Sequence, residues 1–390
     1  MRAKIPEHRN SPDPERRLKI GYVSPDFRTH AIMRIMPSVL AKYDRQHFEV
    51  FAYLIDLKQQ DGVTERLRQS MEHFVTLPPN AEDCRARAGR RHRHPDRFGG
   101  THMPVEALLA FARKPAPVQA SWLGVHATTG LRTMDYFPGD AHLPAPGTEE
   151  KVYRLPRVQY CYHPESDPGL APSPHFQNGY LTFGSFNNPS KLNREMVKAW
   201  SVILHLVPGS KLLFKYATPF REMTAARLRA WFQEDGIAAE RLSFAGTDWN
   251  VPYVASWNCI DVALDPFPYN GGTMALDALW MGVPVVSMSG RLAVSCCGRV
   301  FLGALGLPVA RTLDDYVALA LEMVKMVLTQ PKSRQFIRNA MSQSPLMDGE
   351  GALESAYRTL WRNWCSGQTG ELALNLSAQP PPKKRHSSRT

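Results

Sequence analysis

The chain has 390 residues, of which 43% are hydrophobic and 21% are charged, and its formal net charge at pH 7 is +11. These proportions exclude a disordered or fibrous protein, and the length allows two globular domains. The sequence has no continuous apolar run of about 18 residues, which a membrane-spanning helix would need, and its N-terminus lacks the apolar core of a secretory signal.

Much of the positive charge lies in residues 85–97 and 380–390. Neither run interleaves aromatic with basic residues, so solvated segments are favoured over a nucleic-acid site, and nucleic acid is the less favoured partner. The six cysteines show no CxxC pair and no Cys/His spacing of a metal site. We therefore expect reduced thiols in a cytoplasmic protein, with no metal and no other cofactor.

The first half of the chain is predicted to be an α/β unit over residues 18–150, after a flexible lead at 1–17. A strand over 18–27 runs into a loop that carries His30, and a helix over 35–43 and a strand over 48–55 follow. A helix is predicted over 67–74. Residues 84–102 then interrupt the pattern with arginines, histidines and glycines, before a helix, a proline stop and a strand over 105–124.

A proline-rich crossing is predicted over 151–178, followed by a second α/β unit over 179–366 and a disordered basic tail over 367–390. The alternation of strands and helices predicts two Rossmann-like domains that face a central cleft, with ligand at the carboxyl ends of the strands. In the second unit, strands are predicted over 180–187, 211–216, 241–246, 260–265 and 283–288, and helices over 196–208, 224–236, around Val254, and over 273–281, 313–328 and 353–364.

The turn Asn270-Gly271-Gly272-Thr273 connects a predicted strand to a predicted helix. A glycine pair that opens a helix leaves backbone N–H groups directed at one point, where the helix dipole adds partial positive charge. The turn is therefore a candidate phosphate cradle, to which the Thr273 hydroxyl would contribute. The alternative is that the glycines only supply the positive φ angles of a tight turn.

Three further side chains are candidates for the same site. Lys191 precedes a helix and can neutralise a diphosphate as a point charge, or it can be an ordinary exposed lysine. Asp277 lies one turn along the helix from Thr273 and can accept hydrogen bonds from ribose hydroxyls, or it can complement the helix dipole. His30 has a suitable pKa for a general base, although a loop histidine can also be structural.

The ordered set of these turns resembles the catalytic region of the protein O-GlcNAc transferase / SPINDLY family, in its bacterial form. The matching pieces are "IGYVSPDFRTHA", "FARKPAPVQASWLG", "TTGLRTMDY", "FGSFNNPSKLN", "DVALDPFPYNGGT", "DALWMGVPVV" and "SPLMDG", spread over residues 18–365. The resemblance implies a GT-B fold. It also implies inverting, metal-independent transfer of a sugar from a nucleotide diphosphate, usually UDP-GlcNAc, to Ser/Thr of proteins.

The resemblance also implies roles for individual residues. His30 matches the family's active-site histidine and Lys191 the lysine that contacts the diphosphate. Asn188 matches a donor-contacting polar position, Thr273 a phosphate-binding threonine, and Asp277 the ribose-binding aspartate. Tyr253 stands where a base-contacting histidine is common, and an aromatic ring there can stack on uracil.

Several residues depart from the family pattern. Val125, His126 and Ala127 replace Tyr-Pro-Gly, Met274 replaces a second threonine, and Cys296 replaces an arginine. An apolar strand is missing at residues 84–102, and the tetratricopeptide repeats that usually precede this domain are not found. The alternatives are therefore a catalytically impaired nucleotide-binding remnant, or a related transferase that uses GDP-fucose or UDP-glucose.

Overall fold

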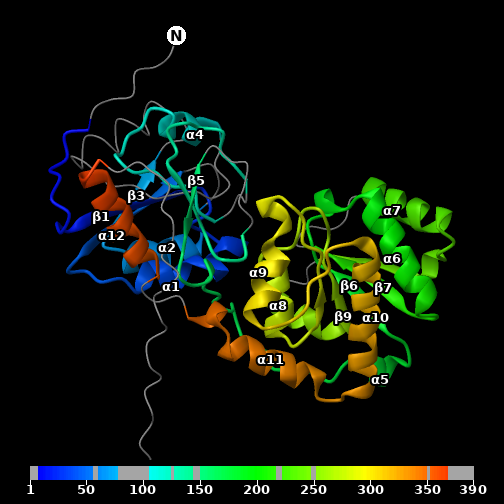
Figure 1. Cartoon of the computed structure of the whole chain (residues 1–390). Helices are drawn as coiled ribbons and strands as arrows, with labels where there is room; N and C mark the ends of the chain where they lie inside the picture. Colours follow the sequence, from blue (N-terminus) through cyan, green and yellow to red (C-terminus); the bar gives the residue numbers. More distant parts are fainter. Residues whose placement is uncertain are drawn as a thin grey trace, which may run out of the picture.

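The computed structural model describes residues 8–55, 60–77, 105–123, 127–143, 150–216, 222–246, 252–348 and 352–367. The molecule has two lobes side by side, each built around a parallel sheet (Figure 1). The interrupted segment 84–102 and the tail 368–390 lie outside the described residues. In the described ranges, no helix combines the length and apolarity required to cross a membrane.

The first lobe is built on a three-stranded sheet of order β1-β2-β3, in which both neighbouring pairs are parallel. β1 and β2 are apolar runs that are buried along nearly their whole length, as strands covered on both faces must be. A second sheet of two parallel strands, β4 and β5, lies beside it. The elements are β1 (Leu18–Ser24), η1 (Ala31–Arg34), α1 (Met36–Ala41), β2 (Phe48–Ile55), α2 (Gly62–Ser70), β3 (His73–Leu77), α4 (Val105–Phe111), β4 (Tyr136–Gly139) and β5 (Lys151–Arg154).

The second lobe contains a five-stranded sheet of order β10-β9-β6-β7-β8, and all of its neighbouring pairs are parallel. Its elements begin after the crossing and are α5 (His175–Asn178), β6 (Thr182–Ser185), η2 (Pro189–Lys191), α6 (Arg194–Leu206), β7 (Lys211–Lys215), α7 (Glu222–Glu234), η3 (Ala239–Arg241), β8 (Leu242–Ala245), η4 (Tyr253–Cys259), β9 (Val262–Leu264), α8 (Thr273–Trp280), β10 (Val285–Val286), η5 (Ala293–Ser295), α9 (Cys297–Ala304) and α10 (Leu313–Thr329).

The chain returns to the first lobe through α11 (Ser333–Gln343), η6 (Pro345–Met347) and α12 (Ala352–Cys365). The hydroxyls of Tyr22 in β1 and Tyr357 in α12 are hydrogen-bonded at 2.6 Å. The indole N–H of Trp361 donates to the carbonyl of Asp13 at 2.8 Å. These contacts attach the last helix to the first lobe, so the two lobes are linked at both the crossing and the C-terminal helix.

Most of the predicted elements are present, and the differences have local causes. The helix expected over 67–74 begins earlier, because the Asp61 side chain caps α2 by accepting from the N–H groups of Val63 and Thr64. It ends at Ser70, and Phe74 belongs to β3 instead. The predicted helix around Val254 is the 3₁₀ segment η4.

Among the elements that had no counterpart in the sequence-based expectation are α9, α11 and the two strands of the β4–β5 sheet. α9 contains Gly298 and Gly303, which lower helix propensity, and α11 is largely polar. β5 pairs with β4 across the boundary expected at residue 150. The strand expected at the end of 105–124 is reduced to an isolated bridge between Ala120 and Tyr136.

Candidate functional site

The two turns singled out from the sequence lie next to each other, because the strands that precede them are paired. β6 leads into the turn that contains Lys191, and β9 leads into the turn that contains the two glycines. Phe183 of β6 is in register with Val262 of β9 in a parallel pair. The carboxyl ends of the two strands therefore meet at one edge of the sheet, where ligands bind in open α/β folds.

The glycine turn is held in place by a buried carboxylate. Asp265, which directly follows β9, is 3% exposed. Its Oδ1 accepts from the N–H of Gly271 at 2.6 Å, and its Oδ2 accepts from the hydroxyl of Ser287 at 2.6 Å. Burial raises the pKa of Asp265 to about 7, although both hydrogen bonds and the Lys191 charge act in the opposite direction. Asp265 was not identified from the sequence, although a carboxylate that ends a strand beside a glycine turn is a usable signal.

The glycines are needed for space and not for unusual φ angles. A Cβ atom at Gly271 would lie 2.6 Å from Oδ1 of Asp265 and 2.9 Å from Oδ1 of Asn187. A Cβ atom at Gly272 would meet no atom within 4 Å. Neither glycine has a positive φ, so the alternative that they serve only to permit such angles is wrong. Gly271 packs tightly against the protein, and Gly272 borders open space.

The N-terminus of α8 is open toward that space. No side chain caps the helix at Gly272, and Thr273 is half-buried at its first position. Asn270 is wholly buried, and its side-chain nitrogen donates to the carbonyls of Pro266 and Met288 at 3.1 Å each. Within the described ranges, its side-chain oxygen has no hydrogen-bond partner. This arrangement leaves backbone donors available for an anion.

Lys191 lies directly against the glycine turn, so the alternative of an ordinary exposed lysine is wrong. Its Nζ donates to the carbonyl of Asn270 at 2.7 Å and lies 4.0 Å from the centre of the Tyr269 ring. Desolvation lowers the pKa of Lys191, and the negative charge of Asp265 partly offsets this effect. A desolvated ammonium beside an uncapped helix N-terminus is suited to an anion that carries more than one charge.

Asp277 is wholly buried on the inner face of α8 and contacts residues from outside its own lobe. Its Oδ1 accepts from the hydroxyl of Tyr162 at 2.7 Å, and its Oδ2 accepts from Nη1 of Arg34. Burial raises the pKa of Asp277 to about 6, against the lowering effect of the Arg34 charge. Asp277 is the fifth residue of α8, so it does not act as a partner of the helix dipole in the first turn.

Tyr253 begins η4 and is half-buried beside this group. The Arg34 guanidinium lies 5.9 Å from the centre of its ring, and the ring of Phe186 approaches it edge-on at 6.5 Å. Among the described residues, the Tyr253 hydroxyl finds no hydrogen-bond partner although it is buried. Burial raises the pKa of this hydroxyl above its ordinary value.

His30 caps the short helix η1, whose last residue is Arg34. Its Nδ1 accepts from the N–H of Ile32 at 3.3 Å and lies 3.8 Å from Oδ2 of Asp26, which is buried. A neutral ring that accepts at Nδ1 carries its proton on Nε2. Because η1 packs against α8, His30 belongs to a turn that faces the second lobe.

The remaining candidate residues have simpler surroundings. Asn188 is exposed and caps η2 by accepting from the N–H of Ser190 at 3.0 Å. The Met274 side chain packs on the apolar cluster that contains both Ile32 and Leu276. Cys296 is buried, and the described cysteines form no disulfide.

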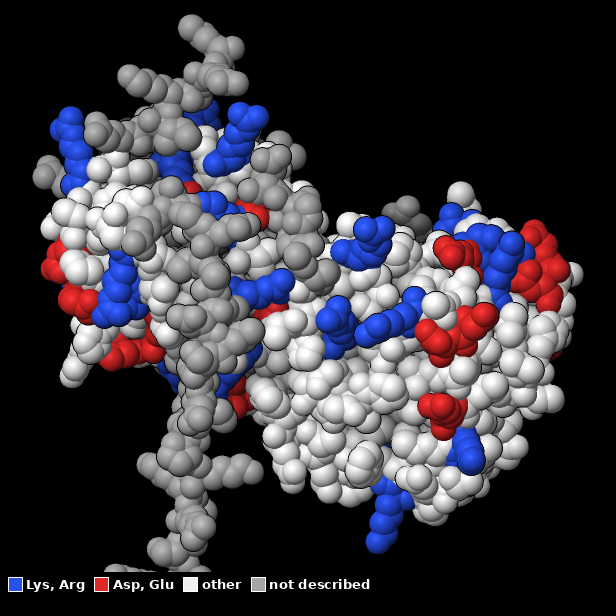
Figure 2. Space-filling view, viewed as in Figure 1, with Lys and Arg blue, Asp and Glu red and all other residues white. Residues whose placement is uncertain are grey.

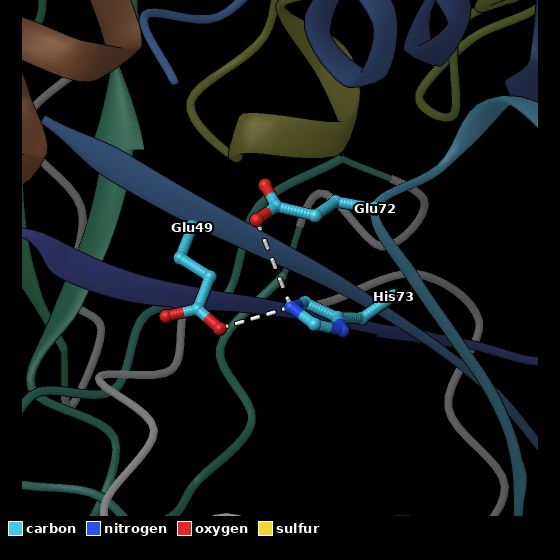
Figure 3. A group of neighbouring side chains, drawn as sticks. All are labelled: Glu49, Glu72 and His73. Atoms are coloured by element: carbon cyan, nitrogen blue, oxygen red, sulfur yellow. Dashed lines mark hydrogen bonds and ion pairs between the residues drawn. The ribbon is translucent and has the colours of Figure 1, made fainter. Parts of the chain in front are cut away.

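A single group of described side chains has the geometry of metal ligands: Glu49, Glu72 and His73 (Figure 3). Glu49 lies in β2, His73 in β3 and Glu72 just before β3, and the group lies on neither turn of the site. Arg17 contacts Glu72 at 3.0 Å, and Lys19 approaches Glu49 at 3.5 Å. These cations already neutralise the two carboxylates, so the group is accounted for as an ion-pair network.

Lys and Arg side chains border the notch between the lobes on the face shown in Figure 2. Arg34 and Tyr162 were not identified from the sequence, because their roles depend on contacts between residues far apart in the chain. The pair Arg34–Asp277 joins positions 243 residues apart, and no local pattern predicts such a pairing.

Comparison with curated proteins finds relatives that share one description. The SPINDLY protein of Petunia hybrida, named as a UDP-N-acetylglucosamine–peptide N-acetylglucosaminyltransferase, is 34% identical over 382 residues, which cover 93% of this chain and 41% of that protein. SPINDLY of Arabidopsis thaliana, with the same description, is 32% identical over 384 residues, covering 93% and 41%. The chain thus spans about two fifths of the length of these relatives.

Comparison with solved structures agrees. An O-GlcNAc transferase mutant of Thermobaculum terrenum superposes with a TM-score of 0.84 at 33% identity, over 93% of this chain and 71% of that chain. The Anabaena HepE protein in complex with UDP has a TM-score of 0.52 at 11% identity, over 90% and 100%, and shows the GT-B fold alone. The model of the glycosyl transferase family 41 matches residues 3–153 and 175–353. The chain is therefore a glycosyltransferase-type protein with a GT-B fold, and it belongs to glycosyl transferase family 41.

Proposed function

We propose that the chain transfers N-acetylglucosamine from UDP-N-acetylglucosamine to Ser/Thr hydroxyls of proteins, with inversion and without a metal ion. The names of the SPINDLY relatives and of the Thermobaculum terrenum enzyme support this donor and acceptor class. The observation that carries the proposal is the contact between Lys191 and Asn270 at the uncapped start of α8. It brings a cation and free backbone donors to one point at the carboxyl ends of β6 and β9.

In this proposal, the donor diphosphate lies on the turn at 270–273. Lys191, the backbone N–H groups and the Thr273 hydroxyl stabilise the charge that develops on the leaving group. Asp277 binds the ribose, Tyr253 contacts the base, and Asn188 lies at the rim of the donor site. A metal ion is not needed for this charge balance, because the protein itself supplies positive charge where the diphosphate departs.

The acceptor hydroxyl attacks the anomeric carbon while the bond from that carbon to the diphosphate oxygen breaks. The hydroxyl proton passes to a base, and we propose His30 because it lies on the turn of the first lobe that faces α8. The proton goes to Nδ1, the nitrogen that carries none in the neutral ring, and Nδ1 gives up its hydrogen bond from the N–H of Ile32 to take it. Its contact with the buried Asp26 would stabilise the protonated ring. We place the reaction in the cytoplasm, where free cysteines such as those described in this chain stay reduced.

The test is a transfer assay with UDP-N-acetylglucosamine and a Ser/Thr peptide library, read by mass spectrometry. UDP-glucose and GDP-fucose are assayed in parallel, because related transferases with those donors are the nearest alternatives. Calorimetric titration with UDP and GDP, combined with the transfer assay, separates a transferase from a nucleotide-binding remnant, because the remnant would bind nucleotide without turnover. If the protein binds neither UDP nor GDP, both the transferase and the nucleotide-binding remnant are excluded.

A further inference from the structure

The ion pair between Arg34 and Asp277 connects the two lobes at the donor site. Arg34 ends η1 in the first lobe, and Asp277 lies in α8 of the second. Nη1 of Arg34 donates to Asp277, while Nη2 donates to Glu165 of the crossing at 3.2 Å. The side chain of Arg34 is 14% exposed and that of Asp277 is 1% exposed, whereas Glu165 is 53% exposed.

The carboxylate of Asp277 is inaccessible in this arrangement. Tyr162 occupies one oxygen and Arg34 the other, and no surface of Asp277 remains open. A ribose hydroxyl therefore cannot reach the carboxylate until one of these donors moves. Tyr162 is itself 1% exposed, whereas the Arg34 side chain is 14% exposed and reaches solvent.

Arg34 is the donor that can leave. Its backbone is held by the N–H of His163, which donates to the Arg34 carbonyl at 2.6 Å, so that only the side chain needs to move. When it swings away from Asp277, it keeps an exposed partner in Glu165. The buried carboxylate then needs a new donor, because an unpaired buried charge is strongly unfavourable. A ribose hydroxyl can supply that hydrogen bond.

We propose that Arg34 is an affinity-determining residue of the donor site, which competes with the donor ribose for Asp277. The inference rests on the proposed function, because it takes Asp277 as the ribose acceptor. Nucleotide binding then exchanges a contact between the lobes for a contact with the ligand. The affinity measured for nucleotide is reduced by the fraction of molecules in which Arg34 covers Asp277.

The test is calorimetric titration of UDP and of 2′,3′-dideoxy-UDP into wild type, Arg34→Met and Glu165→Gln. Methionine retains much of the apolar stem but cannot pair with Asp277. We expect Arg34→Met to bind UDP roughly 3- to 30-fold more tightly than wild type. Dideoxy-UDP should show no such gain, because it has no ribose hydroxyl with which to take the place of Arg34. Glu165→Gln, which keeps the pair with Asp277, should change UDP affinity less than roughly twofold.

Three results would overturn the proposal: unchanged or weaker UDP binding by Arg34→Met, an equal gain for both nucleotides, or the same gain in Glu165→Gln. If Arg34→Met does not fold, Arg34→Lys serves in its place. Arg34→Lys keeps a positive charge near Asp277 but loses the forked guanidinium group. It should show a smaller gain in UDP affinity, which again depends on the ribose hydroxyls. Failure of every protein, wild type included, to bind UDP would instead remove the proposed function.

Discussion

Two turns contact α8 from different lobes, and they are held in different ways. The glycine turn at 270–273 is fixed by hydrogen bonds within its own lobe, from Asp265 below and from Asn270 to neighbouring carbonyls. The turn at 30–34 packs against α8 and pairs with the second lobe through Arg34 and Asp277. The hydrogen bonds of the first turn lie within its own lobe, whereas the ion pair of the second can be exchanged for a ligand. Nucleotide binding is therefore expected to need the first turn and to be opposed by the Arg34 contact of the second, whereas turnover is expected to need both turns.

The largest effect is expected for Lys191→Ala. Removal of the ammonium beside the α8 N-terminus should lower the rate of donor turnover roughly 100- to 1000-fold. The midpoint of thermal unfolding should change little, because Lys191 is only half-buried. Lys198→Ala, an exposed lysine on the adjacent helix α6, is the matched control. Equal turnover by Lys191→Ala and the control would remove Lys191 from the mechanism.

The His30→Ala variant tests the other turn. Loss of a general base should slow transfer by at least roughly 100-fold, while UDP affinity stays near that of wild type because the glycine turn is intact. Single-turnover rates and calorimetry together measure the two quantities. A normal transfer rate would leave His30 with only its capping role on η1.

A pair of glycine variants tests whether the first turn is as rigid as its contacts indicate. In Gly271→Ala the new methyl group would lie against Asp265 and Asn187, and we expect the free energy of unfolding to fall by roughly 1–3 kcal/mol. UDP binding should weaken as well. Gly272→Ala places its methyl group in open space and should lower the free energy of unfolding by less than about 1 kcal/mol. Urea titrations of both variants measure the free energy of unfolding. Equal losses in the two variants would contradict the tight packing at Gly271.

The smallest effect concerns the dependence of stability on pH. Burial raises the pKa of Asp265 from 3.8 to about 7. The folded state therefore binds the proton more tightly, and the stability that Asp265 contributes is present at low pH and lost as the pH rises through about 7. Relative to Asp265→Asn, wild type should have a smaller advantage in free energy of unfolding at pH 8 than at pH 5. A larger advantage at pH 8 would mean that the two hydrogen bonds outweigh desolvation.

The same contrast explains what could be predicted from the sequence. The glycine turn, Lys191 and Asp277 were selected as candidates because strand, turn and helix signals are local, and pairing of β6 with β9 brings the two turns together. The sequence did not identify Arg34, Tyr162 or the exposed state of Asn188, because these depend on packing between segments far apart in the chain. α9 was missed because Gly298 and Gly303 lower its helix propensity, and α11 was missed because it is largely polar.

The central claim is that the turn at 270–273, together with Lys191, binds a diphosphate. Calorimetric titration of UDP and of uridine into wild type and Lys191→Ala tests it most directly, because the two ligands differ only in the diphosphate. Wild type should bind UDP at least roughly 100-fold more tightly than uridine, and this ratio should fall to less than roughly tenfold in the variant. The same ratio in both proteins would contradict the account.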